Sequence, residues 1–295
     1  MKKIIIILAC ISMSTSAVLV RWAQAPSPVL VFYRMLFSVL MLLPPLLIRH
    51  RAELSAAGKK DLLRCMGCGI VLGLHFVLYF ASLRHTSIAS SLVLVDTEFL
   101  FVALAMTLLF RERIPLLGWI GMGVAFIGAV IIARSDAGGE TALRGDAEAL
   151  LGAAAIACYS LMGRACRKRG MSTTVYTCFA YLGAAVTMLL TVLVSGGTPA
   201  CTGRDLLCAF GMSVFSTLLA HSVFIWGMKY VSPTFITTAK LIEPLFSTLW
   251  GVLFLGEVPG AAVIIGGVIT IAGVIVCARY GDPTQKPAPA DTPAQ

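Results

Sequence analysis

The stretch Pro233–Glu257, PTFITTAKLIEPLFSTLWGVLFLGE, decides the fold of this chain. It is long and apolar enough to cross a lipid bilayer, which takes about 20 apolar residues. Yet Lys240, Glu243 and Pro244 lie near its middle, where a buried charge and a break in the helix are both costly. Charged residues inside a membrane helix usually face a cavity or one another, so the stretch predicts one wall of a transport path.

The composition predicts an all-α integral membrane protein. Of 295 residues, 58% are hydrophobic and 13% are charged, whereas soluble domains carry about 25% charged residues. The surplus of apolar side chains is therefore expected to face lipid. Ten apolar runs are long enough to span the bilayer, and they predict ten transmembrane helices at residues 4–20, 29–48, 65–83, 88–110, 115–133, 147–163, 173–194, 206–226, 233–255 and 260–278.

The distribution of basic residues predicts the orientation. The first run, which follows Lys2 and Lys3, resembles a signal peptide, but its apolar character continues to Val20, so we expect an uncleaved first helix. With the N-terminus inside, 16 of the 23 lysines and arginines lie on inside segments and five on outside segments. This bias places both termini in the cytoplasm, in a multi-pass protein of the cell (inner) membrane. It also argues against nucleic-acid binding, because no single folded surface collects the net charge of +9.

The two halves of the chain repeat each other in their charged, aromatic and glycine positions. A shift of 145 residues aligns Glu98 with Glu243, Glu112 with Glu257, Gly121 with Gly266 and Gly128 with Gly273, and a shift of 143 aligns Arg21 with Arg164 and Tyr33 with Tyr176. Each half holds five predicted helices, and an odd number makes the second half enter the membrane in the opposite sense. We therefore predict two inverted five-helix repeats around a central cavity. The expected division is a first repeat at 1–133, a polar linker at 134–146, a second repeat at 147–280 and a disordered cytoplasmic tail at 281–295.

Several short motifs within these halves resemble the drug/metabolite transporter (DMT) superfamily, in its ten-helix EamA-type branch. In the second half they are Lys229-Tyr230-Val231-Ser232-Pro233, Glu243-Pro244-Leu245-Phe246, Gly256-Glu257 and Gly266 with Gly273; in the first half they are Ser82-Leu83-Arg84-His85-Thr86-Ser87, Arg111-Glu112-Arg113, Gly121 with Gly128, and Arg34. The resemblance implies a multi-pass transporter. Two departures stand out. First, the first half has Asp96-Thr97-Glu98-Phe99 where the family has a Glu-Pro pair, so nothing there predicts a helix break. Second, Lys240 lies outside the family pattern, which makes it a candidate specificity residue.

Six residues are candidates for substrate binding or coupling, and one proline is a candidate helix break: Arg34, His75, Tyr79, Glu98, Lys240 and Glu243, with Pro244. Lys240 and Glu243 are three residues apart and share a helix face, so they either neutralise each other or form a pair that substrate or a proton opens. Pro244 has no N–H, which leaves the carbonyl of residue 240 without its helical donor. Glu98 is the repeat partner of Glu243. Asp96 would point about 200° away from Glu98 on a continuous helix, so Glu98 is the expected cavity residue.

Three of these features keep two interpretations. Arg34 lies only about 7 Å from the outer end of its helix. It therefore either contacts substrate, or extends to the interface or pairs with another group in a structural role. His75 and Tyr79 either pack within the bundle or take part in proton coupling. Cys65-x-x-Cys68 is half of a metal or redox motif, but no second pair follows it, and no metal site is expected.

The residues favour a secondary transporter of a small polar metabolite. The chain has no G-x-x-x-x-G-K-[ST] loop for ATP. Positive and negative groups within the membrane suit a zwitterion, which favours an amino acid or a related compound, moved by alternating access with or without a coupling proton. The direction of transport, including export, stays open, and so does the choice between monomer and homodimer. The alternatives are a passive channel and an intramembrane enzyme; no catalytic residue or cofactor is expected.

Overall fold

The computed structural model describes residues 1–86, 88–135, 143–256 and 260–280. Over these ranges the secondary structure is entirely helical, as the composition predicts. The predicted tail at 281–295, most of the predicted linker, Ser87 and Glu257 lie outside the described residues.

The first half of the chain forms α1 (Lys2–Ser14), α2 (Ser16–Trp22), α3 (Ser27–Arg49), α4 (Arg51–Ala56), α5 (Lys59–His85), α6 (Ile88–Asp96), α7 (Glu98–Leu108) and α8 (Leu116–Ser135). The second half forms α9 (Leu143–Lys168), α10 (Thr173–Val194), α11 (Gly203–Met212), the π-helix η1 (Ser213–His221), α12 (Ser222–Gly227), α13 (Pro233–Lys240), α14 (Glu243–Leu255) and α15 (Ala261–Tyr280). Eight of the described helical stretches are long and apolar enough to cross a membrane. A shorter apolar stretch lies in α8, and the span predicted at 233–255 is divided between α13 and α14, so the count of ten stays a prediction.

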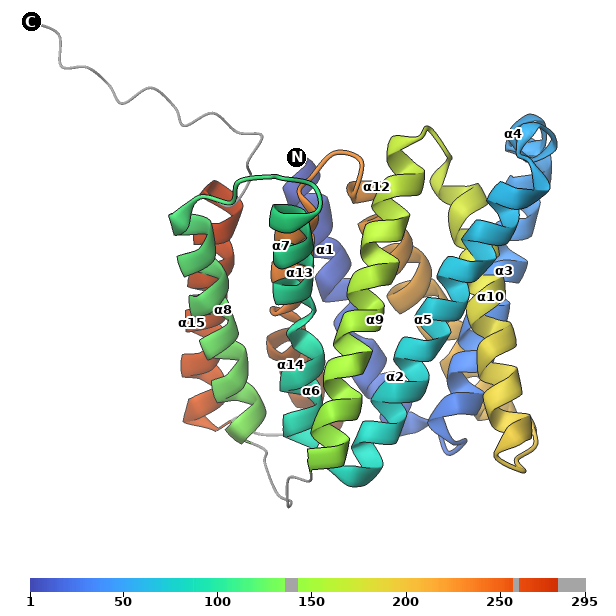
Figure 1. Cartoon of the computed structure of the whole chain (residues 1–295). Coiled ribbons are helices and arrows are strands. Elements are labelled where there is room, and N and C mark those ends of the chain that lie inside the picture. The colour runs from blue at the N-terminus through green and yellow to red at the C-terminus, as the bar shows by residue number, and fades with distance from the viewer. Residues whose placement is uncertain (87, 136–142, 257–259, 281–295) are drawn as a thin grey trace, which may run out of the picture.

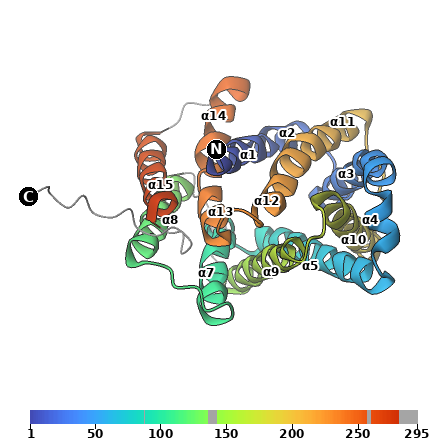
Figure 2. The same ribbon diagram turned by 90° about the horizontal axis from the view of Figure 1, so that it is seen from above.

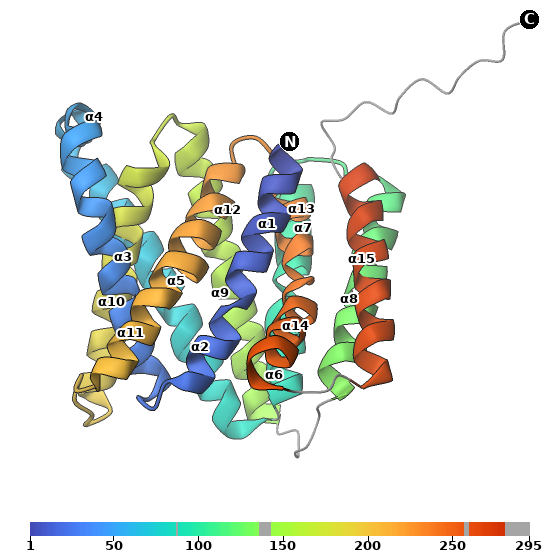
Figure 3. The ribbon, with the colours of Figure 1, turned by 180° about the vertical axis from the view of Figure 1, so that it is seen from behind.

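The helices stand side by side in one bundle (Figure 1). The N-terminus, α4 and the C-terminal end of α15 lie at the same face, which we call the N-terminal face. Seen along the bundle, α1, α7 and α13 lie between the pair α8 and α15 on one side and α3, α5 and α10 on the other (Figure 2). In the view from the opposite side, the helices nearest to the reader are α11, α12, α1 and α14 (Figure 3).

Helices that the sequence repeat relates pack against each other. α8 and α15 are neighbours along their length and run in opposite directions, and so do α3 and α10 (Figures 1 and 2). The repeated glycines explain how closely α8 approaches α15: a Cβ added to Gly128 would lie 2.5 Å from the carbonyl oxygen of Gly266, and one added to Gly273 would lie 2.2 Å from the nitrogen of Ala125. Small residues permit this backbone contact. These glycines therefore serve packing within the chain.

Two carboxylates fasten the connections between helices at opposite faces. Asp205 accepts hydrogen bonds from the backbone N–H groups of Gln24 (2.7 Å) and Ala25 (3.1 Å), which ties the start of α11 to the α2–α3 connection. At the N-terminal face, Glu53 accepts the N–H of Ser172 at 2.6 Å, which ties α4 to the start of α10. Partial burial raises the pKa of Glu53, but this hydrogen bond and that of His50 outweigh it and hold the pKa below the usual 4.5.

Candidate functional site

Two interrupted helices meet inside the bundle. α6 ends at Asp96 and α7 begins at Glu98, while α13 ends at Lys240 and α14 begins at Glu243. The shift of 145 places Thr97 on Ile242, so both repeats are interrupted at the same position. α7 packs against α13, which brings the two interruptions together (Figure 2). The break in the first half is a feature that the sequence does not predict.

The two interruptions have different local causes. Pro244 supplies no N–H to the carbonyl of residue 240, and the chain tightens there: Leu241 N donates to Thr238 O and Ile242 N to Ala239 O, both at 3.1 Å. No proline lies at the interruption in the first half. There the Thr97 hydroxyl donates to Leu94 O at 2.5 Å, and its N–H reaches the same carbonyl at 3.2 Å. A threonine side chain that competes for a backbone carbonyl in this way loosens a helix.

Lys240 forms an ion pair with Glu98 across the two repeats. Lys240 Nζ lies 2.7 Å from Glu98 Oε2, and the Ser160 hydroxyl on α9 donates to Glu98 Oε1 at 2.8 Å. Both side chains are largely buried, with 12% and 8% of their surface exposed. The Lys240 ammonium lies at the C-terminal end of α13, which is the negative end of that helix dipole. The Glu98 carboxylate lies at the N-terminal end of α7, which is the positive end, so both charges are stabilised. The structure thus chooses a different partner for Lys240 from the neighbouring Glu243 that the sequence suggested.

Two further carboxylates lie in the field of this pair. Glu243 begins α14, where Lys240 and Arg34 act on it electrostatically, and within the described part of the chain its carboxylate has no hydrogen bond or ion pair. Asp96 ends α6 and faces the charges of Glu243, Glu98 and Lys240. The expectation that Asp96 points about 200° away from Glu98 assumes a continuous helix, and the interruption at Thr97 removes that assumption.

Arg34 lies inside the bundle, with 6% of its surface exposed. Its Nε donates to the Thr217 hydroxyl at 2.7 Å and its Nη2 to Ser216 O at 3.3 Å, both on η1. Its guanidinium carbon also lies 5.8 Å from the ring centre of Phe76. The interfacial interpretation of Arg34 is therefore wrong. A π-helix such as η1 is rare and is frequently found at functional sites.

The predicted aromatic pair lies beside these charges. His75 Nδ1 is 2.9 Å from the carbonyl oxygen of Gly152 on α9, and because that oxygen only accepts, Nδ1 carries the proton. The His75 ring stacks on Tyr79, with centres 6.3 Å apart and planes 7° apart. His75 lies within the fields of Glu98, Lys240 and Arg34. The packing interpretation of His75 is supported by its hydrogen bond, and its Nε2 is left as an acceptor in the neutral ring.

The structure thus gathers five of the predicted site residues with four that the sequence analysis did not select. The five are Arg34, His75, Glu98, Lys240 and Glu243, and Tyr79 stacks on their edge; the four are Asp96, Ser160, Thr217 and His221. We call all ten the midplane cluster. Its members come from α3, α5, α6, α7, α9, η1, α13 and α14. No group of three His, Cys, Asp or Glu side chains in the described ranges could hold a metal ion.

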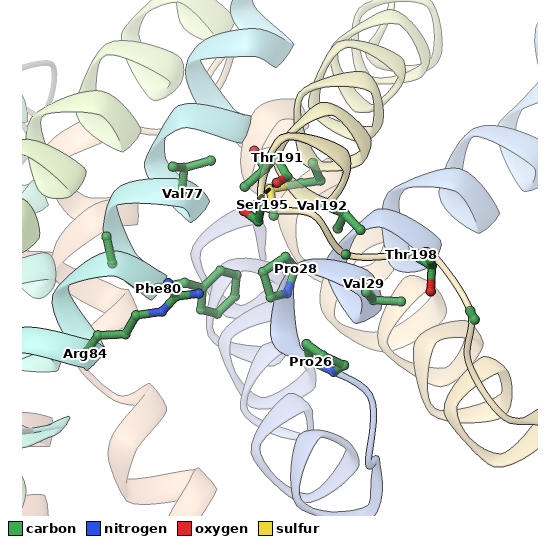
Figure 4. Close-up of a pocket in the computed structure, with 14 residues that line it drawn as sticks. Pro26, Pro28, Val29, Val77, Phe80, Arg84, Thr191, Val192, Ser195 and Thr198 are labelled. Carbon is green, nitrogen blue, oxygen red and sulfur yellow. Dashed lines mark hydrogen bonds between the residues drawn. The ribbon is translucent and has the colours of Figure 1, made fainter.

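A cavity of about 520 Å³ lies among helix ends at the face opposite the N-terminal face (Figure 1), and Figure 4 shows the side chains that line it. It lies between the start of α3, the end of α5 and the end of α10. Arg84 and Phe80 stand on one side of it, Pro26 and Pro28 on another, and Thr191 on a third (Figure 4). None of the predicted site residues lines it, so this cavity and the midplane cluster are separate features of the structure.

Membrane helices that are interrupted at matching positions of two repeats, with a buried ion pair between the interruptions, are typical of a multi-pass membrane transporter. The chain belongs to the EamA-like transporter family, which matches residues 2–134 and again 143–279. This confirms the family resemblance and the two-repeat architecture, and it places the protein among the DMT transporters. The family gives no sign of an enzyme.

Named relatives agree with this assignment. The chain is 27% identical over 281 residues to the "Pseudopaline exporter CntI" of Pseudomonas aeruginosa, covering 92% of this chain and 94% of that protein. It is 23% identical over 254 residues to the "Uncharacterized transporter YxxF" of Bacillus subtilis, covering 84% and 80%. A solved crystal structure, 21% identical, superposes with a TM-score of 0.77 over 95% of this chain and 98% of its own, which shows a shared fold.

Proposed function

We propose that the protein moves a small metabolite that carries both a carboxylate and an amino group, by alternating access between two inverted five-helix repeats. The observation that carries this proposal is the Lys240–Glu98 ion pair, which joins the two repeats at their interruptions. A cargo carboxylate competes with Glu98 for Lys240. Once released, Glu98 accepts the cargo's amino group together with Glu243, which has no bonded partner among the described side chains. Amino acids and related compounds have this chemistry.

The charges of the midplane cluster leave room for one coupling proton. Its formal charges are two cations, Arg34 and Lys240, and three carboxylates, Asp96, Glu98 and Glu243, with both histidines neutral. One proton shared among the carboxylates makes the cluster neutral, and a zwitterionic cargo does not change that balance. A buried cluster is most stable without a net charge, so the cluster holds one proton with or without cargo, and coupling requires that this proton be exchanged when the cluster opens to water.

Orientation and direction complete the proposal. The N-terminal face is cytoplasmic in the cell (inner) membrane, because the basic residues concentrate in the segments assigned to it. Ten crossings enclose a central path at the midplane cluster, and the cavity near Arg84 is separate from it. Export is the direction, in keeping with the exporter name of the Pseudomonas aeruginosa relative. The glycine contacts of α8 and α15 lie within one chain, so these glycines do not require a dimer.

A binding screen followed by counterflow tests the proposal. The purified protein is heated with each of the twenty amino acids, because a ligand of the folded state raises its apparent stability. The best binder, radiolabelled, is then followed into proteoliposomes preloaded with the unlabelled compound. Saturable uptake that rises with preloading supports a carrier. Uptake that does not saturate indicates a channel, and chemical conversion without flux indicates an enzyme. The absence of any stabilising amino acid rejects the twenty amino acids as cargo.

Substitution of Lys240 locates the site. Lys240→Met is expected to abolish binding, while Lys60→Met, which removes an exposed lysine from α5, leaves it unchanged. Unchanged affinity in folded Lys240→Met would exclude Lys240 from the cargo site.

A further inference from the structure

Three cysteine side chains meet near the N-terminal face, away from the midplane cluster. Cys65 and Cys68 lie on α5, and Cys166 lies on α9. Cys166 packs against the buried cluster that contains Cys65 and Cys68, and its thiol interacts with both other thiols. Cys65 Sγ also lies 3.3 Å from the thioether sulfur of Met171, on the loop after α9. The sequence has no second Cys pair to follow Cys65-x-x-Cys68, and the fold adds one further thiol, that of Cys166.

The packing of the two helices explains why these thiols meet. α5 and α9 run in opposite directions and pack along their length (Figure 1). They are joined further along by the hydrogen bond between His75 and Gly152. Because both helices reach the N-terminal face there, the cysteines near their ends come together.

The three thiols differ in access and in charge environment. Cys65 and Cys68 are buried, with 0% and 1% of their surface exposed, whereas Cys166 is partly exposed. The positive charges of Arg64 and Arg169 act on Cys166. A partly exposed cysteine beside cationic side chains, with a second thiol in contact, is the arrangement in which thiols react with peroxide.

We propose that Cys166 is a peroxide-reactive thiol that forms a reversible disulfide with Cys65 or Cys68. The Cys166 sulfur attacks hydrogen peroxide, the O–O bond breaks, and a sulfenic acid and one water molecule form. The neighbouring α5 thiol then attacks the sulfenic sulfur, the S–O bond breaks, and a second water molecule leaves. Two thiols are oxidised and one peroxide is reduced to two waters, so no further reactant is needed.

The disulfide would join the two repeats covalently. α5 belongs to the first matched region, 2–134, and α9 to the second, 143–279. Alternating access requires the repeats to move relative to each other at this face. Oxidation therefore stops transport, a consequence that rests on the proposed function, whereas formation of the disulfide does not.

Thiol counting tests the site directly. The purified protein is treated with hydrogen peroxide, unfolded in detergent with an alkylating reagent, and weighed intact. The chain has nine cysteines. The wild type is expected to lose two alkylated thiols and to recover them with dithiothreitol. The Cys166→Ser protein loses none, while Cys158→Ser, which removes an exposed cysteine of the same helix, still loses two.

Other results would overturn the proposal. They are nine alkylated thiols after peroxide treatment, a loss that dithiothreitol does not reverse, or a loss of two in Cys166→Ser. Flux in proteoliposomes tests the consequence separately: it should fall on oxidation, return on reduction, and be insensitive to peroxide in Cys166→Ser. Unchanged flux in protein shown to carry the disulfide refutes the block on transport, whereas failure of the transport proposal itself would already be seen in untreated wild type.

Discussion

The ion pair between Lys240 and Glu98 should show strong coupling in a double-mutant cycle. At 2.7 Å and an effective dielectric constant of about 20, the attraction is about 6 kcal/mol. Removing both charges from water costs several kcal/mol per ion, so the pair contributes little net stability. Removing one partner, however, leaves the other charge buried and unpaired, which costs about 3–5 kcal/mol. Lys240→Met and Glu98→Gln should each destabilise the protein by this amount.

The double variant should be much more stable than the sum of the two single variants predicts. Because Lys240→Met/Glu98→Gln leaves neither member of the pair as an unpaired charge, it should lie within about 1–2 kcal/mol of the wild type, which gives a coupling energy of at least about 4 kcal/mol. Unfolding by sodium dodecyl sulfate in mixed micelles, followed by the fluorescence of the four tryptophans, measures the stabilities. Binding of the cargo should be lost in all three variants.

The chain supplies a matched control pair. Arg64 and Asp61 on α5 lie 2.8 Å apart, but 63% and 48% of their side-chain surface is exposed. Their coupling energy should be below about 1 kcal/mol, because water screens exposed pairs. If the Lys240–Glu98 coupling is no larger than that of the control, the pair is not a buried ion pair and the reasoning is refuted.

Three further outcomes are expected. A Cβ on Gly69 would lie 1.9 Å from a backbone oxygen of α10, so Gly69→Ala should lower stability by at least about 2 kcal/mol. A Cβ on Gly67 meets nothing within 4 Å, so Gly67→Ala should cost no stability. Equal melting temperatures of the two variants would contradict the packing. Arg34→Lys should weaken cargo binding about tenfold or more, because a single ammonium cannot replace the planar guanidinium, and unchanged affinity in the thermal-shift titration would confine Arg34 to holding η1. The hydrogen bonds of Glu53 hold its folded pKa below its unfolded value of 4.5, so the stabilisation that it gives is present above pH 4.5 and is lost as the pH falls through the folded pKa. The melting temperature of wild type should therefore exceed that of Glu53→Gln by less in that pH range. A difference in melting temperature that does not change with pH would exclude the linkage.

The course of the chain follows from local sequence to a large extent. Apolar runs and the charges between them predict membrane helices, because each helix satisfies its own backbone hydrogen bonds in lipid and needs no distant partner. The repeated glycines Gly128, Gly266 and Gly273 could not be assigned from the sequence to a contact within the chain or between two chains. Either contact would require small residues. The family motifs indicated the transporter class because each is a short run of neighbouring residues that can be read directly from the sequence.

For the site, the sequence indicated the candidate residues but not which of them pair with one another. The charges of Glu98, Lys240 and Glu243 within apolar runs were enough to mark them as candidates, because an isolated charge is costly in lipid wherever it occurs. Their pairing was beyond the sequence. Proximity along one helix suggested Lys240 with Glu243, but the interruption at residues 241–242 ends the shared face, and packing of α13 against α7 offers Glu98 instead.

The opening stretch shows the division most clearly. Its composition alone determined that Pro233–Glu257 enters the membrane and carries polar groups there, and Pro244 alone determined that its helix is interrupted. Only the tertiary structure decided that Thr97 interrupts the first repeat at the matching position, and that Lys240 neutralises a carboxylate 142 residues away. The physical reason is that hydropathy and proline act within one segment, whereas the partner of a buried charge is fixed by which helices pack together.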